Sequence, residues 1–500
     1  MSTARKILSN TIAQIMSKAV TALIGVAVVK ISTTYLSRAG YGEYVFVYEF
    51  LAFFGIAADL GLFTIAVREM SYDDSKISKI IGNILSLRTL LVISTMLLSI
   101  LAIFLIPKYE NTRIPIGVAI ATLSTFFTIL NGTVSSVLQA KLKMHISSAT
   151  AVLSKIISVS LMAYIAFIGY PDDQNMGFYL FLWAGVFANM VMFFTTAHYV
   201  KKITTLNYQF DFQLWKDLLY KSLPYGVALI LSTMYFRIDS MMISYMRGNE
   251  ELGLYGAAMK ILEQLGIIPL YFMNAVLPVL SRNLKENNTE NYKKVISYAF
   301  DFLAVISIPM VVGGYLLAYP IIFIISTPEF LSDLSRGFYG SDMAFKILIF
   351  ASMFQFLGVL FAFILIALDK QKKLLYINAA CVIFNIVTNA IFIPIYGFVG
   401  AAVTSVICEI FILAATFFTA RHYLHFHLNL KNLAKIVASS LIMGLCIYLL
   451  QDPTYALIQN WNVFLLIIIG ALIYGILIIL SGVIDRKMIN TIRSKAPEQI

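Results

Sequence analysis

Charged side chains interrupt the long apolar stretches of this sequence, and their presence there needs an explanation. The basic ones are Lys18, Lys30, Arg88, Lys155, Arg237, Lys260 and Lys346, and the acidic ones are Glu49, Asp59, Asp239, Glu263, Asp301 and Glu409. A charge in hydrocarbon is costly, so each is expected to face a water-filled cavity or an oppositely charged partner. These residues are therefore the candidates for binding and transport.

The basic residues are of the types that bind phosphate groups. Arginine holds phosphate oxygens in bidentate fashion, and lysine supplies a compact point charge. Lys18 and Arg237 are the strongest candidates to face a cavity. The predicted substrate-binding set is Lys18, Lys30, Arg88, Lys155, Arg237 and Lys260. A positively charged chamber of this kind suits a diphosphate group and repels an organic cation.

Several of these side chains also have a simpler interpretation. Lys260 and Glu263 are three residues apart and could neutralise each other. Arg88 and Lys155 lie near one membrane edge and could extend to lipid headgroups. Polar residues at helical spacing in several segments indicate either a hydrated cavity or ordinary helix–helix contacts.

The composition indicates a membrane protein. Of 500 residues, 60% are hydrophobic and only 13% are charged, and the net charge is +11. The lysines and arginines concentrate in short segments between apolar runs, a membrane-topology pattern that argues against nucleic acid as a partner. The three cysteines have no metal or disulfide spacing and are expected to be small core residues.

Fourteen segments are long and apolar enough to cross a bilayer as helices. Their approximate ranges are 11–36, 43–68, 81–106, 113–139, 147–169, 176–200, 217–246, 253–281, 293–326, 342–368, 374–393, 398–421, 431–450 and 461–483. Most basic residues of the connections fall on the side that holds the N-terminus. Positive connections stay in the cytoplasm, so both termini are predicted to be cytoplasmic and the protein to lie in the inner (plasma) membrane.

A weak internal repeat divides the chain. Gly42 and Tyr44 follow the first segment as Gly253 and Tyr255 follow the seventh, and two further matches lie downstream at similar offsets. The predicted fold is an all-α membrane protein with two six-helix lobes around a central cavity, plus two C-terminal helices. The predicted domains are 1–205, 206–428 and 429–500. Facing repeats of this kind are typical of alternating-access transporters.

The motifs of common enzymes are missing from the sequence. It contains neither the GxxxxGK[ST] phosphate loop nor HExxH, which favours a transporter over an enzyme. His422, His425 and His427 cluster after the twelfth segment, either as a metal site or, with more weight, as an interfacial loop.

Three stretches resemble the polysaccharide flippase branch of the multidrug/oligosaccharidyl-lipid/polysaccharide exporter superfamily, including the O-antigen and capsule repeat-unit flippases. The first covers 35–71, the second covers 222–266 and is followed by "AVLPVLSR" at 275–282, and the third covers 367–410. The second, which begins "SLPYGVALILSTMYFRIDSMM", and the third, which contains "FNIVTNAIFIPIYGFVGAAV", are specific to the superfamily. The resemblance implies export of undecaprenyl-diphosphate-linked oligosaccharide to the outer leaflet by alternating access. It also implies a surface polysaccharide pathway, with a polymerase and a chain-length regulator as partners.

The resemblance further implies a coupling ion, sodium or proton, and no other cofactor. Positions matching the sodium site of a related lipid II flippase group are Asp239, Asn385, Asn389 and Ser405, with Glu409 one turn further on. Their oxygens suit a hard cation. Asn389 replaces an acidic residue of that group, so Glu409 could carry protons instead. Alternatively, the two asparagines only join helices through hydrogen bonds.

Two other functions compete with the flippase. A drug or organic-cation antiporter of the same superfamily would use carboxylates, and Glu49 and Asp59 keep that alternative open, with Asp59 as a further ion-coupling candidate. A membrane glycosyltransferase or polymerase would need a large outer loop with catalytic acids. The longest predicted outer loop, 327–341, is short.

Overall fold

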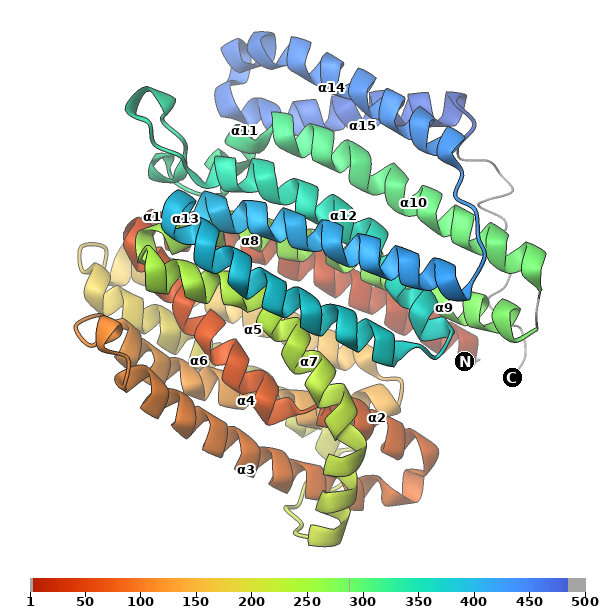
Figure 1. The fold of residues 1–500 in the computed structure, drawn as a ribbon. Helices are drawn as coiled ribbons and strands as arrows, with labels where there is room; N and C mark the ends of the chain where they lie inside the picture. Colours follow the sequence, from red (N-terminus) through yellow and green to blue (C-terminus); the bar gives the residue numbers. More distant parts are fainter. Residues whose placement is uncertain (1–2, 287, 484–500) are drawn as a thin grey trace. The chain divides into compact units, whose positions relative to one another are not determined.

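The computed structural model describes residues 3–286 and 288–483, so the end of the predicted domain 429–500, from residue 484 on, lies outside the described residues. The chain is built from helices (Figure 1). The α-helices are α1 (Thr3–Asp59), α2 (Leu62–Tyr72), α3 (Ile77–Phe104), α4 (Ile114–Ala140), α5 (Met144–Tyr164), α6 (Gln174–Lys201), α7 (Phe212–Met246), α8 (Asn249–Leu265), α9 (Ile267–Lys285), α10 (Thr289–Leu316), α11 (Ala318–Ile325), α12 (Ser341–Ala367), α13 (Gln371–Tyr423), α14 (Leu430–Ile458) and α15 (Asn462–Leu480). The prediction of an all-α membrane protein is confirmed.

The number of membrane crossings is not settled by the helices alone. In the part of the chain that the structure describes, 11 helical stretches are long and apolar enough to span a bilayer. Three of them, Met16–Tyr72, Gln371–Tyr423 and Leu430–Leu480, exceed 50 residues, whereas about 20 suffice for one crossing. Ser37 in α1 and Gly397 in α13 have non-helical backbone and mark kinks within two of these stretches. The count of fourteen stays a prediction.

The helix surfaces are those of a protein in lipid. One stripe of α15 is buried, at Val463, Leu466, Gly470, Tyr474 and Ile478, with the spacing of three or four residues that keeps side chains on one helix face. The other faces of α15 expose leucine and isoleucine side chains. A helix that is apolar all round and buried on one side only is stable where hydrocarbon covers the rest.

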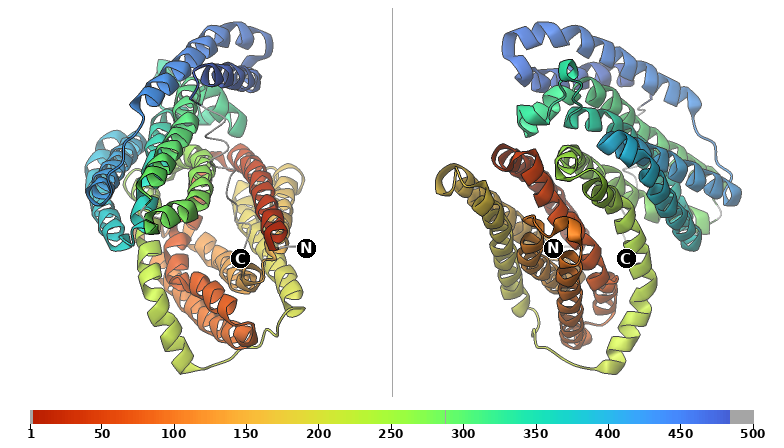
Figure 2. Two further views of the ribbon diagram at one scale, coloured as in Figure 1. Left: turned by 90° about the vertical axis from the view of Figure 1, so that its right-hand side faces the viewer. Right: turned by 60° about the vertical axis from the view of Figure 1, so that its left-hand side comes forward.

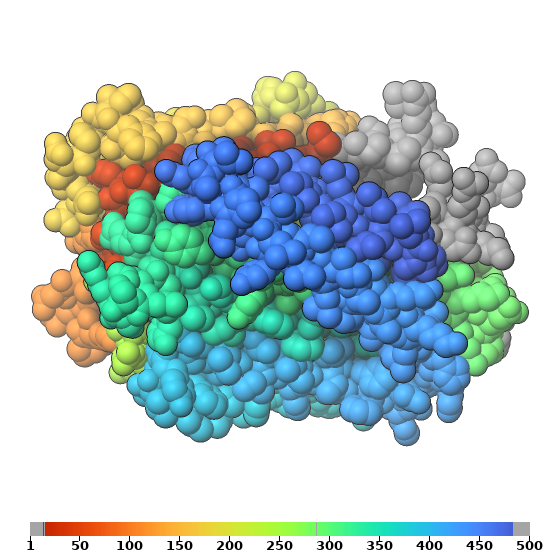
Figure 3. All heavy atoms as spheres, turned by 90° about the horizontal axis from the view of Figure 1, so that it is seen from above, coloured from red at the N-terminus to blue at the C-terminus, as the bar shows by residue number. Residues whose placement is uncertain are grey.

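The residues form two compact units, Met1–Gly253 and Leu254–Ile500, with the boundary inside α8. In the first unit, α4 packs against α3 and α6, and α1 packs against α5 and α7 (Figure 2). In the second unit, α12 packs against α10 and α13, while α14 and α15 lie side by side at one edge next to α10. Figure 3 shows side chains of these two last helices on the surface of that unit. The predicted lobe boundaries at 205 and 428 stay predictions.

The repeat glycines of the first unit meet at a close helix crossing. A Cβ atom on Gly42 would lie 1.7 Å from the backbone carbonyl oxygen of Asn249, and one on Gly253 would lie 2.3 Å from that of Arg38. Both distances are shorter than any normal contact between a Cβ atom and a carbonyl oxygen, so neither position can accommodate a side chain without a shift of the backbone. The sequence repeat therefore marks a point where two backbones touch.

The segment that connects α6 to α7 is tied to α3. Ser86 Oγ accepts a hydrogen bond from the Gln209 amide (3.0 Å), and Asn83 Oδ1 accepts one from the Asp211 amide (2.7 Å). Asp211 caps α7 and pairs with Lys79 at 2.9 Å. Hydrogen bonding to Lys79 and to a backbone amide lowers the pKa of Asp211. These contacts hold the connecting segment against α3.

Candidate substrate and ion-pair site

The second half of α1 carries three carboxylates, and each contacts an arginine from a different element of the first unit. The pairs are Glu43 with Arg113, Glu49 with Arg237, and Asp59 with Arg88. Buried charges that are not paired are strongly destabilising, so these contacts explain how the unit tolerates them. The three pairs differ in how much of each side chain is exposed, and they are therefore described one by one.

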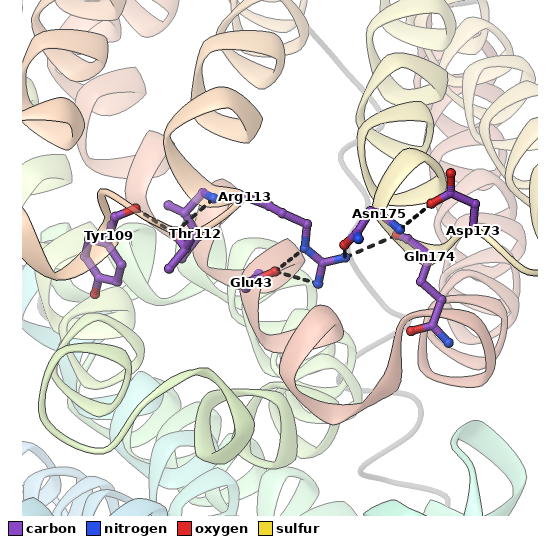
Figure 4. Close-up of polar contacts among 8 residues, drawn as sticks. Glu43, Tyr109, Thr112, Arg113, Asp173, Gln174 and Asn175 are labelled. Atoms are coloured by element: carbon purple, nitrogen blue, oxygen red, sulfur yellow. Dashed lines mark hydrogen bonds and ion pairs between the residues drawn. The ribbon is translucent and has the colours of Figure 1, made fainter.

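The Arg113 pair joins three helix ends (Figure 4). Its Nε and Nη2 lie 2.7 Å and 2.6 Å from Glu43 Oε2, and its Nη1 donates to the Gln174 carbonyl (3.2 Å) and to Asn175 Oδ1 (3.3 Å). The guanidinium also lies over the Phe178 ring, 4.8 Å from its centroid. Sequence reasoning did not single out this pair, because both residues lie at helix ends where charge is unremarkable.

The Arg88 pair is buried on the arginine side. Arg88 Nη2 donates to Asp59 Oδ1, and the exposed fractions of the two side chains are 3% and 20%. Within residues 3–286 and 288–483, Arg88 Nε and Nη1 have no hydrogen-bond partner. The alternative in which Arg88 extends to headgroups is wrong, because a carboxylate on a neighbouring helix holds it in the interior. Sequence reasoning had assigned Arg88 to substrate and Asp59 to an ion, whereas the two side chains contact each other.

The Glu49 pair has the opposite burial. Arg237 Nη1 lies 2.7 Å and 2.8 Å from the two oxygens of Glu49. The carboxylate is buried, with 6% of its side chain exposed, while 29% of the Arg237 side chain is exposed. Asp239, two residues further on, is buried in the same unit. In this pair the arginine side chain is partly exposed, and the carboxylate that it contacts is buried.

Lysines on α1 and α5 form a second group in the first unit. Lys18 and Lys155 are exposed, and Lys30 is half-buried. Ser17 Oγ donates to the Ser148 carbonyl at 3.1 Å, which ties the two helices together next to Lys18. Lys155 is seven residues beyond Ser148, about 10 Å along α5. Lys18 and Lys155 thus lie on two helices that are in contact.

In the second unit, Lys260 Nζ lies 3.0 Å from Glu263 Oε2. This geometry matches the simpler interpretation, in which the two charges neutralise each other within α8. Both side chains remain partly exposed, so an anion could still reach Lys260.

The predicted ion-coupling residues of α13 lie on the two arms that its kink at Gly397 separates. Asn389 Nδ2 donates to Asn385 Oδ1 at 3.1 Å, and both residues are fully buried. On the other arm, Glu409 is buried and Ser405 Oγ lies 3.4 Å from the Tyr255 hydroxyl. Cys381 Sγ lies 3.9 Å from the Cys408 carbonyl oxygen, so the two arms are in contact.

This contact makes α13 a hairpin that gathers the predicted residues of the second unit. Asp239 and Asp59, the two remaining predicted members, belong to the first unit. The coupling ion and the residues that would hold it stay predictions.

The histidine cluster carries no metal site in the structure. Among residues 3–286 and 288–483, no group of three or more His, Cys, Asp or Glu side chains is arranged to hold a metal ion. The metal alternative for His422, His425 and His427 gains no support from this arrangement and stays a prediction. Cys381 and Cys408 are buried and form no disulfide, as expected for core residues.

The fold is that of known membrane transporters. A lipid II flippase, MurJ, in an inward closed conformation superposes with a TM-score of 0.73 at 18% identity, over 96% of this chain and all of that one. An inward-facing multidrug resistance MATE family transporter of the MOP superfamily superposes with a TM-score of 0.64 at 14% identity, over 84% and 98%. These two likenesses establish the fold, an all-helical fold shared with membrane transporters.

Sequence comparison assigns the family. The model of the family described as "Polysaccharide biosynthesis protein" matches residues 7–284, and the MatE model matches 224–391. A "Putative O-antigen transporter" of Shigella flexneri is 23% identical over 80% of this chain and 94% of its own length. A "Probable multidrug resistance protein YpnP" of Bacillus subtilis is 25% identical over 46% and 51%.

The chain belongs to the polysaccharide biosynthesis protein family, in the polysaccharide transporter branch of the MOP superfamily. It is a transporter and not an enzyme.

Proposed function

We propose that the chain is a flippase that moves undecaprenyl-diphosphate-linked oligosaccharide from the cytoplasmic to the outer leaflet by alternating access. The products would enter the assembly of O-antigen, capsule or exopolysaccharide. The substrate joins a long apolar tail, a diphosphate and a polar glycan. A transporter for it needs cations that can hold the diphosphate inside the membrane.

The observation that carries this proposal is the distribution of charge in the first unit. Arg88 and Arg113 each contact a carboxylate, whereas the side chain of Lys18 on α1 is exposed. Exposed lysines at membrane depth are costly unless water or an anion meets them. A diphosphate would supply that anion.

The relatives support the same substrate class. The Shigella flexneri relative is described as an O-antigen transporter, and the MurJ structure is that of a lipid II flippase. One description names O-antigen as the transported molecule, and the other names lipid II. We infer by analogy an inner-membrane location with cytoplasmic termini, a sodium or proton gradient as the driving force, and a polymerase and a chain-length regulator as partners.

A cation-coupled drug antiporter is the second candidate, favoured by the MatE match and by the Bacillus subtilis relative. An organic cation would need exposed carboxylates within the membrane. Glu49 and Asp59 are the carboxylates on which that alternative rests, and each contacts an arginine. Their charge is thereby neutralised, which favours the flippase.

Lipid analysis of a deletion strain tests the proposal. We expect undecaprenyl-diphosphate repeat units to accumulate while the surface polysaccharide disappears, and the trapped lipid would identify the glycan. Unchanged surface polysaccharide with new sensitivity to cationic drugs would refute the flippase and establish the antiporter.

Complementation with variants tests the lysines. Lys18→Ala and Lys155→Ala should restore surface polysaccharide poorly at normal protein levels. Lys202→Ala removes another exposed lysine, at the end of α6, and serves as the control. Full activity of the double variant Lys18→Ala/Lys155→Ala would exclude these lysines from substrate binding.

A further inference from the structure

We propose that an apolar pocket of the first unit binds an acyl chain of an anionic phospholipid, with the lipid phosphate at Lys108. The pocket has a volume of about 200 Å³ and is open to the surface. It is lined by Phe46, Ile106, Tyr109, Met241, Met242, Tyr245 and Met246, which all belong to the first unit. The proposal goes beyond the transport of a glycan, because it requires only that the protein lies in a bilayer.

Three elements of the first unit meet at this pocket. Phe46 comes from α1, Ile106 and Tyr109 come from the connection between α3 and α4, and the other lining residues come from the end of α7. Phe46 and Tyr109 are buried and their ring centroids lie 4.7 Å apart, so they form the inner wall. Tyr245 and Met246 are exposed and lie at the mouth. Residues that are far apart in the sequence therefore enclose one space.

The lining of the pocket suits hydrocarbon. Its exposed surface is almost entirely apolar. The Tyr109 hydroxyl oxygen lies 3.0 Å from Ser244 Oγ, so its hydrogen-bonding capacity is used inside the protein. The three methionines have flexible, polarisable side chains that adapt to the shape of a ligand. One water molecule needs only about 10–15 Å³ but also several polar partners, so a hydrocarbon chain fits this space better than water does.

The surrounding lipid can supply such a chain. Leu101, Phe104 and Leu105 come just before Ile106 in the sequence, and their side chains are exposed. Exposed apolar side chains at the end of a membrane-spanning helix are covered by the hydrocarbon of the bilayer. A chain can therefore pass from the bilayer into the pocket. On the proposed topology, this end of α3 faces the outer leaflet.

Lys108 provides a cation at the mouth of the pocket. Its Nζ donates to the Tyr245 carbonyl oxygen and lies 5.4 Å from the centroid of the Tyr245 ring. An ammonium group has three donors, and in the described part of the chain Lys108 forms no ion pair. Arg247, which follows the end of α7, is paired with Glu251 at 2.8 Å, and Glu110 is exposed and does not line the pocket. Lys108 can therefore bind a lipid phosphate while the acyl chain fills the pocket.

Photocrosslinking tests the site directly. Purified full-length protein is placed in phosphatidylcholine nanodiscs that contain a small fraction of phosphatidylglycerol with a diazirine on its acyl chain. Mass spectrometry then maps the crosslinked peptides. We expect the crosslinks to concentrate at residues 104–109 and 241–246 and to saturate as the fraction of probe rises. A phosphatidylcholine probe with the same chain should label these residues about fivefold less, which is the effect of one lysine on an anionic headgroup.

Two variants separate the chain from the headgroup. Met246→Trp should lower the crosslinking at both segments at least about fivefold, because the indole takes the volume that the chain would fill. Met176→Trp, at the start of α6, is the matched control and should leave it unchanged, since the two methionines are similarly exposed, at 43% and 37%, and Met176 does not line the pocket. Lys108→Gln keeps most of the apolar stem and should abolish the preference for the phosphatidylglycerol probe.

Three outcomes would overturn the proposal. The first is crosslinking spread over all exposed apolar helix faces without saturation, which is contact with bulk lipid only. The second is an unchanged phosphatidylglycerol preference in Lys108→Gln, a result that does not depend on whether Met246→Trp folds. The third is displacement of the probe by undecaprenyl phosphate at a lower fraction than by unlabelled phosphatidylglycerol, which would assign the pocket to a polyprenyl tail. Failure of the proposed flippase function would leave the crosslinks as they are and would appear only in the lipids of the deletion strain.

Discussion

Replacing Asp59 by alanine should destabilise the first unit, because it leaves the Arg88 charge buried. Arg88 is 3% exposed and hydrogen-bonds to Asp59. Breaking a buried ion pair by removing one partner costs about 3–5 kcal/mol. Asp59 is 20% exposed, so water can partly replace it, and the lower end of that range, about 3 kcal/mol, is expected.

The double variant Asp59→Ala/Arg88→Met should recover most of this loss. Met fills the volume of the arginine stem and removes the charge together with the two nitrogens, Nε and Nη1, that have no partner among the described residues. Buried hydrogen-bonding groups without partners each cost about 1–3 kcal/mol. The double variant is therefore expected within about 1 kcal/mol of the wild type, or above it.

Thermal unfolding in detergent can follow both units of the protein. Trp183 and Trp215 lie in the first unit, and Trp461, in the second, is replaced by phenylalanine in every protein compared so that fluorescence follows the first unit. The free thiols of Cys381 and Cys408 are buried in the second unit. Tryptophan fluorescence should report the loss in Asp59→Ala at a lower temperature than thiol labelling does. Additive effects of the two substitutions, with no coupling in the double-mutant cycle, would refute the reasoning.

Further predictions concern other contacts. Lys18→Ala should lower flipping in proteoliposomes while shifting stability by less than about 0.5 kcal/mol, since its side chain is exposed; a matching loss of stability would contradict this. Gly42→Ala should cost about 3 kcal/mol or abolish expression, because a Cβ there meets a backbone carbonyl, while Gly25→Ala, with open space around it, serves as control. The ion pair of Asp211 with Lys79 should stabilise the protein fully at neutral pH. Because the pKa of Asp211 is lowered in the folded protein, this stabilisation should be lost only as the pH falls below the ordinary aspartate range. Melting temperatures measured against pH check this, and Asp211→Asn should lack that pH dependence.

The helices and the family were predictable from the sequence. Apolar stretches of sufficient length require helices in a membrane, because every backbone polar group must be satisfied within the segment. Each predicted segment corresponds to helical structure, and the repeat glycines at positions 42 and 253 proved to be a crossing point. The residues of the resemblance pointed to the family that the comparisons assign.

The state of each charge was decided only by the tertiary structure. Arg88 and Asp59 are 29 residues apart, and Arg237 and Glu49 are 188 apart, so no local pattern joins them. Sequence reasoning treated these arginines as ligands for substrate, because it could not see their carboxylate partners. Hydropathy is a property of each segment by itself, whereas an ion pair depends on which faces of two helices meet. That choice is made by packing.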